Sequence, residues 1–164
     1  MTDAAARGVL AIYAEGIATA RATFQADVPD STTSSAGHWT FCRMFAGEEA
    51  TLLGQAAPSS VSARAVYVRT AEVSLPIGAA AGRYGVGQTP LRALPRAAGA
   101  AGIWMLHAGI FFLVSEVRFA LYPRFGYGIL GIPEKSGRMA YGPLAGEWRD
   151  LALLEWLSTK AAAN

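Results

Sequence analysis

Hydrophobic positions switch between helical and strand spacing along the chain, which predicts a mixture of helices and strands. Residues 4 to about 20 place five largely nonpolar side chains on one helical face: Val9, Ile12, Tyr13, Ile17 and Ala20. Residues 27–37 are polar and rich in turn formers, so they predict a loop with room for one helical turn. The segments on either side of Gly47 predict a β-hairpin.

The clearest strand pattern covers residues 65–77. Val73, Leu75 and Ile77 share one side of this strand, and Glu72 and Pro76 must face the other side. Glu72 is the only acid within the pattern.

A glycine-rich segment, "GRYGVG" at residues 82–87, separates this strand from a helical segment at residues 88–98. Pro90 fits the first turn of that helix, where its missing N–H would be unpaired anyway. Pro95 lies deeper, so it predicts a kink or an early end. A strand, a glycine loop and a helix start is the usual arrangement for anion binding, because free N–H groups and the helix dipole converge there.

The C-terminal part predicts a buried strand, a helix and two further strands. Residues 103–112 are continuously nonpolar, as expected of a strand buried on both faces. Ser115 is a suitable N-cap for a helix over residues 116–124, and Gly126 is a suitable stop. The last two strands are predicted within residues 126–132 and 148–157.

The alternative for residues 97–115 is a membrane span, because they include no Asp, Glu, Lys or Arg. Three glycines, His107 and an alanine-rich first half favour instead a helix end, a turn and a strand. The whole order predicts one mixed α/β or α+β domain over residues 1–164.

Composition narrows the classes of function. The chain is 52% hydrophobic and 16% charged, which is typical of a globular protein. The net charge of +2, with no run of basic residues, argues against nucleic-acid binding. The single cysteine, Cys42, excludes an intrachain disulfide, and with only His38 and His107 beside it the residues for a structural zinc site are lacking. The first residues lack the layout of a secretory signal, so the expected location is the cytoplasm.

Five stretches resemble the GCN5-related N-acetyltransferases (GNAT) of the phosphinothricin or methionine sulfoximine acetyltransferase type. They are "LAIYAEGIATARATF" at 10–24, "AEVSLPI" at 71–77, "GVG" at 85–87, "RFGY" at 124–127 and "EWRDLALLE" at 147–155. The resemblance implies the GNAT fold, a central, twisted, mostly antiparallel sheet with helices on both faces. It also implies a homodimer that transfers acetyl from acetyl-CoA to the primary amine of a small amino acid or analogue, by direct attack in a ternary complex.

For the cosubstrate, the resemblance implies a pyrophosphate loop and a pantetheine contact. The loop residues are Arg83, Tyr84, Gly85, Val86, Gly87 and Gln88. Gly82 stands where the family has Gln or Arg. The strand residues Val73, Leu75 and Ile77 and the polar Ser115 are the expected pantetheine contacts, whereas Pro76 removes one backbone donor from that strand.

For catalysis, the resemblance implies that Glu72 is the general base and Tyr122 the acid that protonates the coenzyme A thiolate. The residues alone allow a solvent-facing strand carboxylate and a half-buried core tyrosine. Pro123 removes a helical N–H beside Tyr122.

For the acceptor, the resemblance implies Thr23 and Phe24, and Arg69 if a bulge redirects it; a solvated strand charge is the alternative for Arg69. His107 is expected to be a satisfied core histidine. His38 and Trp39 are expected to cap or pack rather than line the acceptor pocket. Departures at Gly82, Ser115 and the three prolines at 76, 95 and 123 leave a second interpretation open, a non-catalytic GNAT-like domain that binds acyl-CoA or is structural.

Overall fold

The computed structural model describes residues 3–48, 51–81, 88–112 and 119–160. Its helices are α1 (Asp3–Ala18), α2 (Ser31–Gly37) and α3 (Gln88–Ala100). Six strands form one sheet in the order β1-β2-β3-β4-β8-β5. Their bounds are β1 (Met44–Glu48), β2 (Thr51–Ser60), β3 (Thr70–Ser74), β4 (Met105–Phe111), β5 (Gly128–Gly131) and β8 (Leu151–Leu157). A separate ribbon pairs β6 (Gly137–Arg138) with β7 (Trp148–Arg149).

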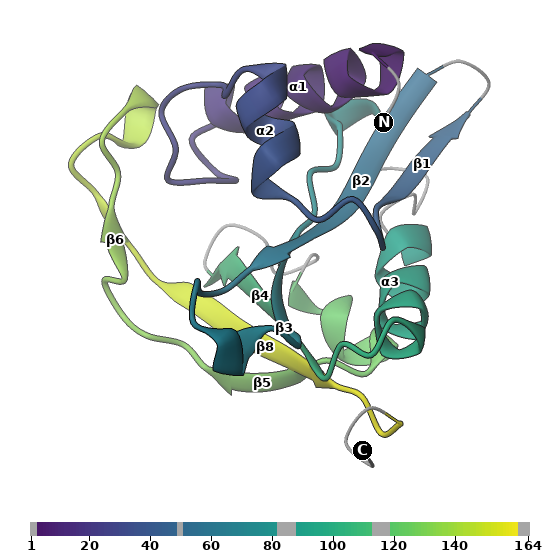
Figure 1. The fold of residues 1–164 in the computed structure, drawn as a ribbon. Coiled ribbons are helices and arrows are strands. Elements are labelled where there is room, and N and C mark those ends of the chain that lie inside the picture. The colour runs from purple at the N-terminus through teal and green to yellow at the C-terminus, as the bar shows by residue number, and fades with distance from the viewer. Residues whose placement is uncertain (1–2, 49–50, 82–87, 113–118, 161–164) are drawn as a thin grey trace.

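The sheet is mostly antiparallel, since β3 and β4 form its parallel pair and its other neighbouring strands run antiparallel. The helices α1 and α2 cover one face and α3 covers the other (Figure 1). The predicted fold class is therefore confirmed.

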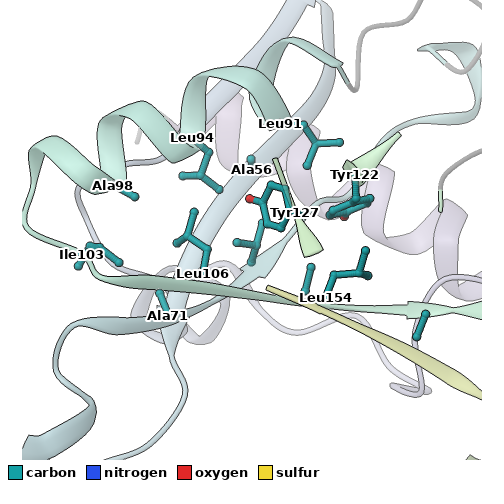
Figure 2. Packing of buried hydrophobic residues seen from close by; sticks show 13 residues of the cluster. Ala56, Ala71, Leu91, Leu94, Ala98, Ile103, Leu106, Tyr122, Tyr127 and Leu154 are labelled. Atoms are coloured by element: carbon teal, nitrogen blue, oxygen red, sulfur yellow. The ribbon is translucent and has the colours of Figure 1, made fainter. Parts of the chain in front are cut away.

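The main core lies between α3 and the sheet (Figure 2). Leu91, Leu94 and Ala98 of α3 point toward Leu106 of β4 and Leu154 of β8, and all are buried. These helical residues recur at spacings of three and four, so they form one nonpolar stripe.

The helix α3 continues to Ala100 with Pro95 inside it, so the early end predicted at Pro95 is wrong. Pro90 is the third residue of the helix, as its compatibility with the first turn predicted. The chain leaves the helix after Ala100, and Gly102, with a left-handed φ of 79°, forms the turn that follows. There the N–H of Ile103 donates to the carbonyl of Ala98 at 2.9 Å, which satisfies a helix-end carbonyl.

Only the middle of the long strand predicted at residues 65–77 is β structure. Residues Ala65–Tyr67 form a 3-10 turn, and the exposed fractions of Val66 and Val68 are 83% and 69%. The N–H of Val68 donates to the carbonyl of Ala65 at 3.1 Å, so these backbone groups pair locally. Strand propensity depends on neighbouring strands, and here the local turn prevails.

The remaining elements confirm some predictions and correct others. The N-terminal helix and the hairpin around Gly47 are confirmed, whereas residues 27–37 hold the short helix α2. Asp30 begins α2 because its carboxylate accepts from the N–H groups of Thr32 and Thr33 at 2.9 and 2.8 Å. Burial of residues 103–112 on both faces is wrong, since Gly109 is exposed.

In the described part of the predicted helix 116–124, Phe119 is helical, residues 120–121 form a turn, and a 3-10 helix follows at Tyr122–Phe125. Gly126 follows it with φ 85°, which confirms the predicted stop. Of the four final strand elements, β5 falls within the predicted segment 126–132 and β7 and β8 fall within 148–157, whereas β6 lies outside both. Of residues 97–115, those described are the end of α3, a turn and β4, and no described helix has the length and hydrophobicity to cross a membrane.

We expect Leu106→Ala to lower the free energy of unfolding by about 2–5 kcal/mol, because it opens a cavity in a packed core. Leu106 is fully buried. Urea denaturation provides the measurement. The matched control is Val66→Ala, at an exposed site, which should change stability by less than about 0.5 kcal/mol; equal effects would contradict this assignment of the core.

Candidate active site

The parallel pairing between β3 and β4 is confined to three rungs, Thr70 with Met105, Ala71 with Leu106 and Glu72 with His107. Beyond the last rung, β4 continues beside β8 as far as Phe111. The segment after β3 stays paired with β2 instead, so β3 and β4 separate after Glu72 and His107.

The segment after β3 keeps its register with β2 as far as Gly78. The carbonyl of Pro76 accepts from the N–H of Gln55 at 3.0 Å, and the N–H of Gly78 donates to the carbonyl of Leu53 at 3.0 Å. Alternate residues of a strand direct their backbone groups to opposite sides. The groups of Leu75 and Ile77 therefore point away from β2, toward the side on which β4 lies. The backbone N–H that Pro76 lacks would have pointed toward β2, on the same side as its carbonyl.

Glu72 and His107 project from the same face of the sheet, because residues paired directly across a ladder share a face. The row continues in both directions: Ser59 of β2 pairs with Glu72, and Glu155 of β8 pairs with His107. Val73, one residue after Glu72, is buried in the α3 core. The alternation predicted around Glu72 is thus confirmed, and its carboxylate lies on the face opposite α3.

A cavity of about 250 Å³ opens on this face. Its polar side chains are Glu72 and His107, and the rest of its wall is glycine or nonpolar: Val61, Ala108, Gly109, Leu130, Leu151, Leu153 and Leu154. The cavity can hold a small molecule with a nonpolar part and a cationic or hydrogen-bonding group.

His107 is not the satisfied core histidine expected from its nonpolar surroundings in the sequence. It is half-buried and lines the cavity beside Glu72. The alternation of residues along β4 could have indicated that His107 faces away from the core, since it stands between the buried Leu106 and Ala108. Its pairing with Glu72, however, joins residues 35 apart (107 minus 72) through tertiary structure.

Tyr122 lies on the other side of the sheet. It is buried in the α3 core cluster, so the side chain is more enclosed than the half-buried tyrosine that the residues alone allowed. Its ring meets that of Tyr127 edge to face, with centroids 5.2 Å apart (Figure 2). Pro123 is accommodated because it occupies a 3-10 turn instead of a regular α-helix.

Tyr127 keeps its proton more firmly than an ordinary tyrosine. Burial, and then the charge of the neighbouring Tyr122, raise its pKa well above the usual value. Its buried hydroxyl has no hydrogen-bond partner among the described residues.

The residues predicted for the acceptor do not line the cavity. The Thr23 hydroxyl accepts from the N–H of Gln25 at 3.1 Å. Phe24 packs edge to face on Phe111, with centroids 4.6 Å apart. Phe24 belongs to a hydrophobic cluster with Phe111 and Leu151, and Leu151 is also a wall residue of the cavity.

Arg69 is exposed and outside the described cavity wall, and its carbonyl accepts from the N–H of Trp104 at 2.8 Å at the start of the β3–β4 pairing. The β3–β4 register has no bulge that would redirect its side chain.

Other singled-out residues have structural contacts. His38 shares a hydrogen bond of 2.8 Å between its Nδ1 and the Ser34 carbonyl, and Trp39 donates to the Ser60 hydroxyl at 2.9 Å. Burial raises the pKa of the Cys42 thiol, which makes it a poorer nucleophile. Within the described ranges, no three His, Cys, Asp or Glu side chains are grouped to hold a metal ion.

The predicted cosubstrate residues are only partly described. Val73, Leu75 and Ile77 lie where the central strands separate, and Gln88 is the first residue of α3. Gly82, Arg83, Tyr84, Gly85, Val86, Gly87 and Ser115 lie outside the described residues.

No protein-family model and no curated protein sequence matches the chain. Solved structures do match. A GNAT superfamily phosphinothricin acetyltransferase from Sinorhizobium meliloti, in complex with AcCoA, is 23% identical with a TM-score of 0.84, covering 99% of this chain and 89% of that one. A ribosomal-protein-alanine N-acetyltransferase from Brucella melitensis is 21% identical with a TM-score of 0.80, covering 96% of both chains.

An N-acetyltransferase from Staphylococcus aureus Mu50 is 23% identical with a TM-score of 0.80, covering 96% of this chain and 94% of that one. The chain has the GNAT fold. The six-stranded sheet with its short parallel pair is thus the architecture of these acetyltransferases.

We expect Tyr127→Phe to raise the free energy of unfolding by about 1 kcal/mol at neutral pH, because it removes a buried hydroxyl without a partner. The stability gained from holding the Tyr127 proton is complete below the pKa of the unfolded chain. It is lost above about pH 10, where the unfolded chain alone releases the proton.

The variant should therefore lose stability less steeply than the parent between about pH 10 and 12 in thermal denaturation. The control is Tyr67→Phe at a partly exposed tyrosine. The same alkaline profile for the two variants would refute the assignment to Tyr127.

Proposed function

We propose that the protein is an acetyl-CoA-dependent N-acetyltransferase that acts on a primary amine. The observation that carries the proposal is the carboxylate of Glu72, at the last paired rung of β3 and β4 and in the wall of a cavity. The GNAT fold of the acetyltransferases compared above supports it, as does the AcCoA bound to the Sinorhizobium meliloti protein.

The proposed cosubstrate site lies where the two central strands separate. Backbone groups of Val73, Leu75 and Ile77 fit the amides of an extended pantetheine arm, because β4 does not use them beyond the last rung. Pro76 does not interfere, since its carbonyl is bonded to Gln55 on the β2 side. We assign the pyrophosphate to the segment from Arg83 to Gln88, just before the N-terminal end of α3.

The two faces of the sheet suit the two halves of the reaction. On the cavity face, Glu72 accepts a proton from the amine as its nitrogen attacks the thioester carbonyl. On the α3 face, Tyr122 donates a proton to the departing thiolate. Holding both substrates in one complex supplies proximity, and acetyl passes directly between them. Cys42 is outside the described cavity wall and has a raised pKa, which supports transfer without a covalent enzyme intermediate.

We propose a small amino acid or an analogue of the phosphinothricin or methionine sulfoximine type as the acceptor. A cavity of about 250 Å³ can hold such a molecule, and its leucine-rich wall suits an aliphatic side chain. The phosphinothricin acetyltransferase among the compared structures supports the same class.

Release of free thiol from acetyl-CoA tests the function, with methionine sulfoximine, phosphinothricin, methionine and 2-phenylethylamine as acceptors. We expect turnover with at least one of them and binding of acetyl-CoA by calorimetry. Binding without turnover by any of the four would support the alternative, a non-catalytic acyl-CoA-binding domain. The absence of binding would reject both.

Glu72→Gln should lower kcat by about 100-fold or more, because the amide cannot accept the proton. Its affinity for acetyl-CoA, measured by calorimetry, should stay the same. The matched control is Glu134→Gln, an exposed acid between β5 and β6, which should leave kcat unchanged. Normal turnover by Glu72→Gln would remove this residue as the base.

We also propose a homodimer that covers the exposed nonpolar side chains of Ile129 and Leu157. They lie on β5 and β8, and β5 is the last strand in the sheet order, so its outer edge can pair with another copy. Light scattering should give twice the chain mass, and Ile129→Lys should reduce it to the mass of one chain. A monomeric parent protein would refute the proposal.

A further inference from the structure

His107 lines the cavity but has no role in the proposed reaction. Protons must leave the acceptor nitrogen twice. An amine arrives as an ammonium ion with three protons, and the product amide keeps one. A C–N bond forms and the thioester C–S bond breaks; one proton ends on the coenzyme A sulfur and one is released to water. Glu72 alone, still ionised to attract the ammonium ion, leaves one of these transfers without an acceptor.

His107 is placed to supply that acceptor. Its side chain stands beside Glu72 on the same sheet face, and both line the cavity. Neighbouring strands lie about 4.8 Å apart, so the two side chains can reach one ammonium group. Histidine is the side chain that changes its charge between about pH 5 and 8.

The charged neighbours of His107 lie on the strands to either side of it. Glu72 of β3 and Glu155 of β8 are its direct partners on the two neighbouring strands, and both are acids. On β4 itself no other charged residue occurs between Met105 and Phe111, and the remaining described wall of the cavity is nonpolar or glycine. A proton taken up by the imidazole is therefore flanked by an acid on each neighbouring strand.

We propose that His107 takes the first proton from the bound ammonium ion and releases it to water, so that Glu72 can take the second during attack. This assignment rests on the proposed acetyltransferase function. It makes His107 a catalytic residue that contacts the acceptor amine.

The first test needs no turnover. The chain contains two histidines, so imidazole NMR spectra of the protein and of His107→Gln identify the His107 signal. Its chemical shift should change in Glu72→Gln, because the two side chains are neighbours on one face of the sheet. The signal of His38, which is bonded to Ser34 on α2, should not move. A His107 signal that is unchanged in Glu72→Gln overturns the proposal whether or not the protein turns over.

The second test uses the acceptor from the panel above that the parent protein acetylates fastest. We expect His107→Gln to lower kcat/KM about 100-fold at pH 7 with unchanged affinity for acetyl-CoA. The deficit should shrink as the pH rises toward the pKa of the acceptor amine, because the amine then binds already neutral. His38→Gln is the matched control and should behave as the parent.

A deficit that stays constant with pH indicates a packing role and overturns the proposal. A His107 signal that responds to Glu72→Gln in a protein that binds acetyl-CoA but acetylates none of the four amines rejects the acetyltransferase function and, with it, the catalytic role of His107. The two failures are therefore distinguishable.

Discussion

The short parallel ladder between β3 and β4 is the constraint on which the rest of the site depends. Its three rungs bring together segments that are far apart in the sequence, and the last rung joins Glu72 to His107. If the two strands paired along their whole length, the backbone groups of Leu75 and Ile77 would be used within the sheet. Because pairing stops at the last rung, this point of the sheet brings together the side chains of Glu72 and His107 and the backbone groups of Leu75 and Ile77, which β4 does not pair in the described part of the chain.

The sheet also separates two environments that the proposed reaction needs. On one face, α3 packs Leu91 and Leu94 against β4 and β8 and encloses Tyr122 and Tyr127 in nonpolar surroundings. On the other face, Glu72 and His107 border a cavity with a largely nonpolar wall. The period of two along each strand makes this separation possible, since Val73 and Glu72 necessarily face opposite ways. In the proposed reaction, the base Glu72 and the proton donor Tyr122 therefore act from opposite faces of the sheet.

The prolines show which features local sequence rules predict and which depend on tertiary structure. Pro90 lies in the first turn of α3, where a missing N–H costs nothing, and simple helix rules predict this. Pro95 is buried inside the same helix, which continues to Ala100 because packing against the sheet and the left-handed Gly102 beyond its last residue decide its end. Pro76 is harmless for a different reason, namely that its carbonyl is bonded to Gln55 across β2.

The sequence by itself determined the helices α1 and α3, the β1–β2 hairpin, the alternation around Glu72 and the stop at Gly126, because these depend on periodicity and turn chemistry among near neighbours. The family resemblance added the GNAT fold. Tertiary structure alone decided that Val66 and Val68 lie in an exposed turn, that Arg69 lies outside the cavity wall and that His107 belongs to the site. Strand register sets these positions, and it arises from pairing between distant segments, so local patterns do not contain it.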